Sequence, residues 1–591
     1  MNEQASGGGA GAGAGAERPR ALDRSPAAER LAALAREAWD GTMAAQPLFA
    51  TAIGDRRFDD RLADNTPEAD TEDRRRLAGL LVRAREIPEE GLGSADAVTH
   101  AALVAFLEME LDMAESGHVR WAIDPIDGPQ VEFLNIASFQ RIETPEDGER
   151  MVARWQAMGP WLDRHVANVL ASLDAGLVSP KAPIGRVVVE LDDLLGRPLA
   201  AWPLLEPAIA ARPAWTSAER ARFAANLEWA VTDLVRPAFA RYRDALVDIV
   251  LPSARPNDRP GLDAVPGGAG AYRRLARAHT SLDLAPEEIH VIGLAEVERI
   301  DAELETLAGR VLGTSDGAAA RARLRGDRGL HFSTSGEVLA TAQAALARAN
   351  AAIPDWFGVL PEAACGVVEM GAHEAKHSTI AYYRQPAVDG SRPGSYYLNT
   401  TAPETRPSYE AEALAFHEAV PGHHLQIAIA QELDGLPDFR RHAGPNAFVE
   451  GWGLYAERLS DEMGLYTGDL DRIGIASFDG WRACRLVVDT GMHALGWSRD
   501  RAISFMLEHT ALAPGNVVNE VDRYISMPGQ ALAYKLGQLE FLRLRATAQA
   551  ALGPRFDIRA FHDAVLGSGA VPLSTLGTVV QQWLAVRSPA S

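Results

Sequence analysis

The chain has 591 residues, 47% hydrophobic and 23% charged, a composition typical of a globular protein with a large core. The formal net charge of -22 argues against a nucleic acid or an anionic membrane as partner, because both would favour a basic patch. With only two cysteines, Cys365 and Cys484, the sequence excludes a disulfide framework and a cysteine-type zinc site.

The first 24 residues, rich in glycine and alanine, are expected to form a flexible leader. They lack the positive start and apolar run of a signal peptide. No uninterrupted apolar stretch reaches the ~18 residues that a membrane span needs. We therefore expect a soluble protein in the reducing cytoplasm.

From residue 25 onward the dominant pattern is helical. Ser25 and Pro26 occupy cap and first-turn positions before apolar residues at helical spacing. The clearest helix is predicted after Pro286, with two glutamates in its first turn and Gly313 past its end. Similar patterns recur at 98–114, 146–174, 217–249 and 335–351.

Residues 364–402 differ from the rest, because short β-branched and aromatic segments are separated there by glycine and proline. This pattern predicts a small sheet or two hairpins. Segments 252–270 and 386–394, rich in proline and glycine, are the linker candidates. We expect a helical N-terminal half (25–265) and a metal-binding catalytic half (266–591), together forming one continuous catalytic unit.

The stretch FHEAVPGHHLQ, residues 416–426, begins like the H-E-x-x-H helix of zinc peptidases. That motif places two histidines one turn apart on one helical face, beside a glutamate. Here Pro421 occupies the position of the second histidine, and His423 and His424 follow late.

An undisturbed helix would suit neither late histidine. At ~100° and ~1.5 Å per residue, His424 would lie ~10 Å along the axis from His417, and His423 ~9 Å along and well to the side. Pro421 cannot donate a helical hydrogen bond, however, and Gly422 permits unusual dihedrals. The Pro-Gly pair therefore predicts a break or bulge that could bring one of them back, and spacing alone leaves the choice open.

A third ligand is expected to be a carboxylate on a following helix, since a catalytic zinc takes three protein ligands and keeps one position open. NAFVEGWGLYAERL supplies Glu450 and Glu457, seven residues apart and so on one face. Gly451 and Gly453 would allow close packing there. The alternative is that these are common residues, with the histidines serving as satisfied polar groups near a helix end.

HEAVPGHHLQ followed by FVEGWGLYAE resembles a bacterial family called domain of unknown function 885, whose motif runs H-E-x-x-P-G-H-x-x-Q. Matching stretches occur in the same order: LAPEEIHVIGLAEVERI, RPGSYYLNT, VVDTGMH and EVDRYISMPGQALAYKLGQ. The similarity covers most of the chain from about residue 30. This family is grouped with gluzincin-type metallopeptidases, whose mainly helical relatives include angiotensin-converting enzyme and the thermostable carboxypeptidases.

The resemblance implies a mainly α (α+β) fold, a large helical gluzincin-like metallopeptidase with a small β-sheet beside the active-site helix. It makes His417 and His423 zinc ligands, Glu418 the general base and Glu450 the third ligand. His424 would then be a neighbour. Glu457 would lie behind the ligands, fixing the orientation of a histidine ring.

The later motifs suggest further parts of the pocket. Asp489 and His493, four residues apart on a predicted helix, either face the metal or form a structural pair. Tyr524 and Tyr534 are candidates for stabilising the oxyanion.

Arg523 is the candidate for binding a substrate carboxylate, with Lys535 in reserve. The alternative is that Arg523 pairs with Glu520 while the tyrosines pack. Tyr396 and Tyr397, in GSYYLNT, are substrate-binding candidates on a predicted edge strand that could pair with an extended peptide.

We therefore expect a hydrolase with one Zn2+ per chain that cleaves amide bonds of small substrates, with a glutamate as general base. One alternative is the same metal site acting on a non-peptide amide or ester. Another is a catalytically silent binding protein, which the complete set of His417, Glu418, His423 and Glu450 argues against.

Overall fold

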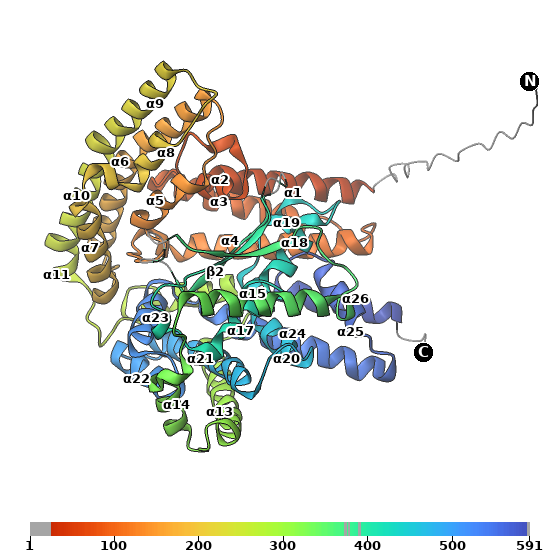
Figure 1. Ribbon diagram of the computed structural model, residues 1–591. Coiled ribbons are helices and arrows are strands. Elements are labelled where there is room, and N and C mark those ends of the chain that lie inside the picture. Colours follow the sequence, from red (N-terminus) through yellow and green to blue (C-terminus); the bar gives the residue numbers. More distant parts are fainter. Residues whose placement is uncertain (1–24, 372–374, 376–378, 388–389, 391, 588–591) are drawn as a thin grey trace, which may run out of the picture.

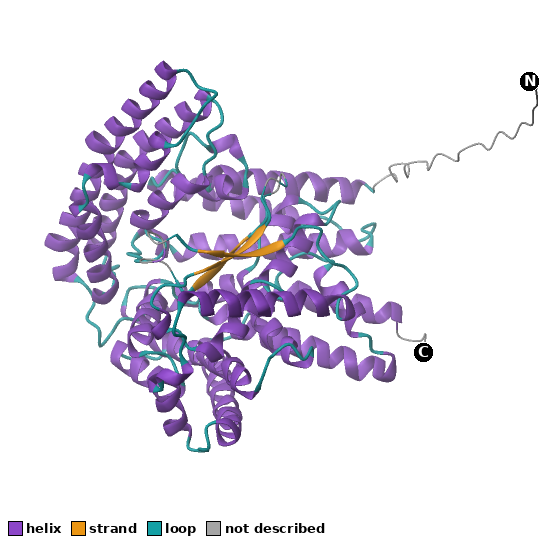
Figure 2. Ribbon diagram, in the orientation of Figure 1, coloured by secondary structure: helices purple, strands orange, loops and turns teal. Residues whose placement is uncertain are grey.

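The computed structural model describes residues 25–371, 375, 379–387, 390 and 392–587, and it is mainly helical with one small sheet (Figure 1). The predicted fold class is therefore confirmed as mainly α (α+β). Figure 2 shows the sheet near the centre of the molecule, surrounded by helices.

The helices of the N-terminal part begin where capping residues and prolines predict. Ser25 accepts a hydrogen bond from the Ala28 backbone at 3.2 Å, with Pro26 in the first turn. Thr144 and Asp147 form a capping box at the start of a 30-residue helix. The helices are α1 (Pro26–Ala45), α2 (Pro47–Ile53), α3 (Pro67–Arg85), α4 (Ser94–Ser116), α5 (Pro129–Phe139), α6 (Pro145–Asp174), α7 (Lys181–Gly196), α8 (Glu206–Ile209), α9 (Ser217–Trp229), α10 (Arg236–Ala245) and α11 (Leu251–Ser253).

The segment predicted as one helix over 217–249 is helical throughout but not uniform. Two π-helical turns, η5 (Ala230–Val235) and η6 (Leu246–Val250), interrupt the α-helical pattern of α9, α10 and α11. Together with α5, α6 and α7 this segment surrounds a hydrophobic cluster of its own, formed by residues between 123 and 250. These helices form the left-hand wall in Figure 1.

The helices of the C-terminal part include the predicted one at Pro286, which ends at Val311, with Gly313 at φ 69° just beyond. The structure describes this helix, α13, together with the other α-helices of the C-terminal part. They are α12 (Gly268–Thr280), α13 (Pro286–Val311), α14 (Gly317–Gly326), α15 (Ser335–Ala352), α17 (Ala411–Glu418), α18 (His423–Glu432), α19 (Asp438–His442), α20 (Asn446–Glu462), α21 (Asp469–Ala494), α22 (Arg499–His509), α23 (Pro514–Ser526), α24 (Leu532–Leu552), α25 (Ile558–Leu566) and α26 (Leu573–Arg587).

The region predicted to contain strands forms one three-stranded sheet. Its strands are β1 (Cys365–Glu369), β2 (Ala381–Arg384) and β3 (Gly394–Leu398), in the order β1-β3-β2. β3 runs parallel to β1 and antiparallel to β2, so it is the central strand. The expectation that GSYYLNT is an edge strand is therefore wrong, because β3 has a neighbour on each side.

The hydrophobic core crosses the predicted boundary at residue 265. Its largest cluster joins residues of 27–107 to residues of 332–580, so α1, α3 and α4 pack with the C-terminal helices. The linker candidate 252–270 is packed rather than free, since a Cβ on Gly261 would overlap the Met492 carbonyl of α21. The other linker candidate, 386–394, lies partly outside the described residues.

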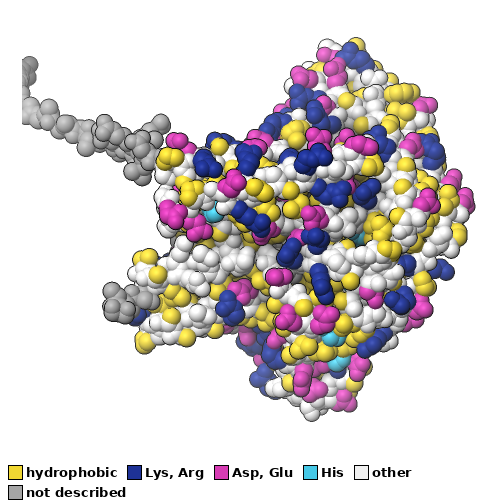
Figure 3. Space-filling view, turned by 180° about the vertical axis from the view of Figure 1, so that it is seen from behind, with side chains coloured by type: hydrophobic (Ala, Val, Ile, Leu, Met, Phe, Trp, Pro, Cys, Tyr) yellow, Lys and Arg dark blue, Asp and Glu magenta, His cyan; other side chains and the backbone are white. Residues whose placement is uncertain are grey.

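The surface carries charges of both signs. Figure 3 shows basic and acidic side chains interspersed over the face seen from behind. No helix within the described part of the chain is both long and apolar enough to span a membrane.

Candidate metal centre

The interrupted motif helix is the local feature that shapes this site. Helix α17 ends at Glu418 and α18 begins at His423, with a cis peptide bond between Val420 and Pro421. A Cβ on Gly422 would overlap the carbonyl oxygen of His417, so a larger residue would push the two helices apart. The break predicted from Pro421 and Gly422 is present.

The break brings two histidines together with a glutamate of α20. Nε2 of His417 and Nε2 of His423 lie 3.6 and 3.5 Å from the same oxygen, Oε2 of Glu450. The two imidazole rings are nearly perpendicular, with centroids 4.6 Å apart. One ligand atom from each of the three residues falls within 4.8 Å of the others, and no other such group occurs among the described residues.

Helix α20 approaches the motif closely because of its glycines. A Cβ on Gly453 would come within 2.7 Å of the His417 ring, and a Cβ on Gly451 within 2.5 Å of the Gly537 backbone of α24. One helical turn further, Glu457 is fully buried and its Oε1 accepts a hydrogen bond of 2.8 Å from Nδ1 of His417. That bond leaves Nε2 of His417 directed at Glu450.

The electrostatics of the cluster favour a cation. Burial opposes charge on His417, but the hydrogen bonds and charges of Glu450 and Glu457 outweigh it and raise its pKa to about 9. Burial would also raise the pKa of Glu450, yet the two histidines hold it well below the ordinary value. A site this rich in carboxylate charge is suited to a positive ion between its ligand atoms.

The donor set fits zinc. Two imidazole nitrogens and one carboxylate oxygen are the ligand types of catalytic zinc sites, which leave a fourth position open. Glu418, next to His417 and half-buried, contributes no atom to the cluster. Its charge nevertheless acts on His417 and helps to raise the pKa of that ring.

His424 is directed away from this cluster. Its Nδ1 accepts a hydrogen bond of 3.0 Å from the Tyr383 hydroxyl of β2, and its Nε2 donates one of 3.0 Å to the Ala363 carbonyl. Burial lowers its pKa to about 4, so the ring is neutral. The structure therefore gives His424 the role of tying α18 to the sheet.

The hydrogen bonds of His493 join it to backbone groups of other segments, and not to Asp489 or to the clustered ligands. The ring is fully buried, its Nδ1 accepts from the Leu262 backbone at 3.2 Å, and its Nε2 donates to the Tyr524 carbonyl at 2.9 Å. Asp489 likewise accepts hydrogen bonds from the Tyr272 hydroxyl and the Gly529 backbone. Asp489 and His493 thus hold neighbouring segments in place.

The hydroxyl group of Tyr524 also has its hydrogen-bond partners within the protein. Its buried hydroxyl donates to Glu520 at 2.6 Å and accepts from Trp481 and Arg485 at 3.0 and 2.9 Å. No donor remains for an oxyanion, so the expected catalytic role of Tyr524 is not supported by its contacts.

Lys535 cannot act as the reserve carboxylate clamp, because its ammonium group is completely buried. It lies 2.6 Å from Asp479 and 2.9 Å from Glu296, and it also donates to Gln538. A cation with two carboxylate partners has no free charge for a substrate.

Arg523, the candidate for binding a substrate carboxylate, already has partners within the protein. Its guanidinium donates to Gln530 at 2.7 Å and to Glu520 at 3.1 Å. Its charge also acts on Asp124 and Asp127, whose pKa values are raised by burial and lowered in part by Arg523. The pairing with Glu520 is therefore real, and any bound carboxylate would share Arg523 with it.

Tyr534 is the candidate tyrosine on which the charge of Glu450, one of the three clustered residues, acts. Burial and the negative charge of Glu450 raise its pKa, while Arg485 and Arg523 act in the opposite direction. The Arg485 guanidinium lies over its ring, 4.3 Å from the centroid. The ring is half-buried, so its hydroxyl remains a candidate donor to a reacting group.

The two β3 tyrosines lie on opposite faces of their strand. Tyr396 is almost completely buried, and its pKa is raised well above the ordinary value by burial and by the charge of Glu418. Tyr397 stacks on Tyr382 of β2, with ring centroids 4.9 Å apart. Of this pair, Tyr396 is the one on which the charge of Glu418 acts.

Two residues near the site were not singled out from the sequence, Arg485 and Gln530. Gln530 is the last residue of the quoted MPGQ motif, so its position beside Arg523 and Tyr534 was the available signal. Arg485 lies on a buried face of α21, and nothing in its local sequence marked it as a site residue. The chain also contains a literal H-E-x-x-H, from His373 to His377, whose histidines lie outside the described residues.

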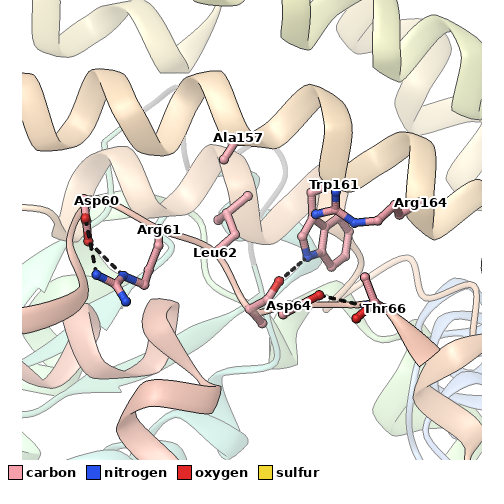
Figure 4. Close-up of a pocket in the computed structure, with 9 residues that line it drawn as sticks. Asp60, Arg61, Leu62, Asp64, Thr66, Ala157, Trp161 and Arg164 are labelled. Atoms are coloured by element: carbon pink, nitrogen blue, oxygen red, sulfur yellow. Dashed lines mark hydrogen bonds and ion pairs between the residues drawn. The ribbon is translucent and has the colours of Figure 1, made fainter. Parts of the chain in front are cut away.

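A separate pocket of about 290 Å3 lies in the N-terminal part (Figure 4). It is lined by the loop from Asp60 to Thr66 and by Ala157, Trp161 and Arg164 of α6. The Trp161 indole donates to the Ala63 carbonyl at 2.9 Å, which joins the loop to the helix. None of the three clustered ligands contributes to it.

Comparison with known proteins places this fold among solved structures. A candidate lipoprotein from Colwellia psychrerythraea is similar, with a TM-score of 0.88 and 26% identity over 95% of this chain and 99% of that one. A candidate lipoprotein of unknown function from Shewanella oneidensis shares the fold, with a TM-score of 0.72 and 15% identity over 94% and 100% of the two chains.

No curated protein matches the chain significantly. The sequence model of one family, described as bacterial protein of unknown function (DUF885), matches residues 47–580. The chain therefore belongs to the DUF885 family.

Proposed function

We propose that this protein is a zinc-dependent hydrolase that cleaves amide bonds, most simply peptide bonds, in small substrates. The observation that carries the proposal is the convergence of His417, His423 and Glu450 at a helix break, with Glu418 beside them. Three ligands and an adjacent carboxylate are what metal-assisted hydrolysis requires. The kinship with gluzincin-type metallopeptidases that the motif suggests belongs to the same proposal.

The protein would hold one zinc ion per chain through His417, His423 and Glu450. When bound, zinc supplies a Lewis acid and lowers the pKa of a coordinated water. Glu457 accepts a hydrogen bond from the Nδ1–H group of His417. The proton of the ring would then stay on Nδ1, which leaves Nε2 free to bind the metal. This role would account for a fully buried carboxylate, Glu457, that is hydrogen-bonded to a ligand histidine.

Glu418 would act as the general base, taking a proton from the attacking water and passing it to the leaving nitrogen. Tyr534 would donate its O–H to the oxygen on which negative charge develops. The buried Tyr396 would be a substrate-binding neighbour of this base, since the charge of Glu418 acts on its phenol. Arg523 would bind a free substrate carboxylate while still paired with Glu520.

The test is Glu418→Gln with metal analysis. The variant should keep about one zinc per chain but lose ~2 or more orders of magnitude in the rate of dipeptide or N-acyl amino acid hydrolysis, because only the base is removed. A wild-type protein that stays active without metal would contradict the proposal. An equally active Glu418→Gln variant would show that another group activates the water.

A panel of substrates also separates this proposal from the first alternative, in which the same metal site acts on a non-peptide amide or ester. Parallel amide and ester substrates with equal acyl parts would reveal the preference. A catalytically silent binding protein would retain zinc yet hydrolyse none of them. The absence of a nucleic-acid or anionic-membrane partner remains part of the proposal, based on the acidic composition. A cytoplasmic location also remains part of it, based on the two cysteines, which form no disulfide framework.

A further inference from the structure

The break between α17 and α18 interrupts the regular backbone hydrogen bonding of the motif helix. The His424 amide donates to the Ala419 carbonyl at 3.0 Å, and the Gln426 amide donates to the Gly422 carbonyl at 3.2 Å. Pro421 lies between these two carbonyls, is buried, and has no amide hydrogen of its own. Its carbonyl needs a donor, because a buried carbonyl left without a hydrogen bond destabilises the fold.

The donor to this carbonyl is a side chain of α20. The indole Nε1–H of Trp452 donates to the Pro421 carbonyl at 2.9 Å. Trp452 has no exposed surface, and its ring packs against those of Phe357 and Phe541, with centroids 6.2 and 5.5 Å away. Because this packing fixes the indole, its N–H group stays directed at the break.

The same stretch of α20 contacts the motif on both sides of the break. Oε2 of Glu450 lies 3.6 and 3.5 Å from Nε2 of His417 and His423. A side chain at Gly453 would overlap the His417 ring, and Glu457 accepts a hydrogen bond from Nδ1 of that ring. One continuous helix therefore contacts both candidate ligand histidines, and its indole holds the turn that separates them.

We propose that Trp452 is a positioning residue that fixes the break between α17 and α18 and so keeps His423 beside His417 and Glu450. Its indole would touch neither metal nor substrate, and it acts through the Pro421 carbonyl. This inference rests on the proposed function, because it assigns a supporting residue to the same metal ligands.

The decisive variant is Trp452→Phe, which keeps an aromatic ring in the core but removes the N–H donor. Without that donor the turn is no longer held to α20, and the two histidines lose their fixed spacing. We expect zinc affinity to fall about tenfold, at the lower end of the ~10–100-fold range for contacts that support a metal ligand. Competition with a chromophoric chelator measures the affinity, and a wild-type value would overturn the inference.

A matched control separates positioning from a general loss of stability. Trp155 of α6 is likewise fully buried, and its indole donates to the Leu204 carbonyl at 3.0 Å. Trp155→Phe should destabilise the protein to a similar extent but leave zinc affinity within about twofold of the wild type, because it supports no ligand. Equal losses of affinity in the two variants would overturn the inference.

A second replacement covers the case in which Trp452→Phe fails to fold. Trp452 is then replaced by 3-benzothienylalanine, whose ring has nearly the same shape as indole with sulfur in place of the N–H. The same loss of zinc affinity is expected, because only the donor to Pro421 is removed. A wild-type affinity would again contradict the role of Trp452.

A further measurement does not depend on zinc. In metal-free protein, backbone hydrogen exchange at His424 and Gln426 should be faster in Trp452→Phe than in the wild type, whereas Trp155→Phe should leave it unchanged. Unchanged exchange in Trp452→Phe would overturn the inference. If the wild type binds no zinc, the proposed function fails, while the exchange rates still decide whether Trp452 holds the break.

Discussion

Nδ1 of His417 donates a 2.8 Å hydrogen bond to Oε1 of Glu457, a carboxylate with no exposed surface. The side chain of Arg482 lies 3.9 Å from the same oxygen and partly balances its charge. The two helices that meet in this contact, α17 and α20, carry the ligand candidates His417 and Glu450, while His423 lies on α18. The bond therefore fixes the ring orientation of His417, the candidate metal ligand.

We predict that Glu457→Gln weakens zinc binding by ~10–100-fold, the usual cost of losing such a supporting contact. Glutamine is nearly the same size, so the packing is kept while the charged acceptor is lost. Competition with a chromophoric zinc chelator measures the affinity. Glu462→Gln, an exposed position on the same helix, serves as the control and should bind zinc like the wild type. Unchanged affinity in Glu457→Gln would mean that His417 needs no support.

A second prediction separates the late histidines. His423→Ala should abolish stoichiometric zinc binding, because it removes one of three ligand atoms. His424→Ala should retain zinc, because that ring is bonded to Tyr383 and Ala363. Metal analysis after dialysis decides between them, and the reverse result would contradict the assigned ligands. The double variant of His373 and His377 should also retain zinc.

A third prediction concerns the substrate carboxylate. Arg523→Met should impair hydrolysis of free-acid substrates far more than of their C-terminal amides, without loss of zinc, because an unpaired buried carboxylate is costly. The ratio of kcat/KM values for the matched substrates is the measurement. Equal impairment would show that Arg523 only balances Glu520, Asp124 and Asp127. Ready digestion of unfolded casein would count against a preference for small substrates.

A fourth prediction concerns stability and pH. Asp479 has no exposed surface and accepts from Lys535 at 2.6 Å and from Arg458 at 2.9 Å. Burial opposes its charge, but Arg458 and Lys535 hold its pKa far below the ordinary value. Asp479→Asn should therefore lower the free energy of unfolding by ~3–5 kcal/mol at pH 7, since it removes one of the two carboxylate partners of the buried Lys535 and of Arg458.

The sign of the pH dependence follows from that lowered pKa. The stabilisation by Asp479 is complete above the unfolded pKa of about 4 and is lost as pH falls below it, so the wild type and the variant should converge in acid. Denaturant unfolding at several pH values tests this. Asp163→Asn, which breaks an exposed pair with Arg241, should cost ~1 kcal/mol or less. A constant difference at every pH would contradict the assignment to Asp479.

Several features of this protein could be predicted from local sequence because they depend on local chemistry. Helix starts followed from Ser25, Thr144 and the prolines after them, since a cap needs only its own next few residues. The break at Pro421 and Gly422 followed from a missing donor and a missing side chain. Glu450 and Glu457 were expected on one helix face because their spacing is helical.

Only the tertiary structure decided what each polar side chain contacts. His493, Tyr524 and Lys535 are residue types that often serve as functional groups, but their donors are already occupied. Some of the partners are on other elements, such as Asp479 for Lys535, and some are on the same helix, such as Glu520 for Tyr524. β3 became the central strand because β1 and β2 pair on both sides of it, which its own residues do not specify. Spacing constrains a residue within one element, whereas long-range packing determines which elements meet, as where α18 and α20 bring His423 within 3.5 Å of Glu450.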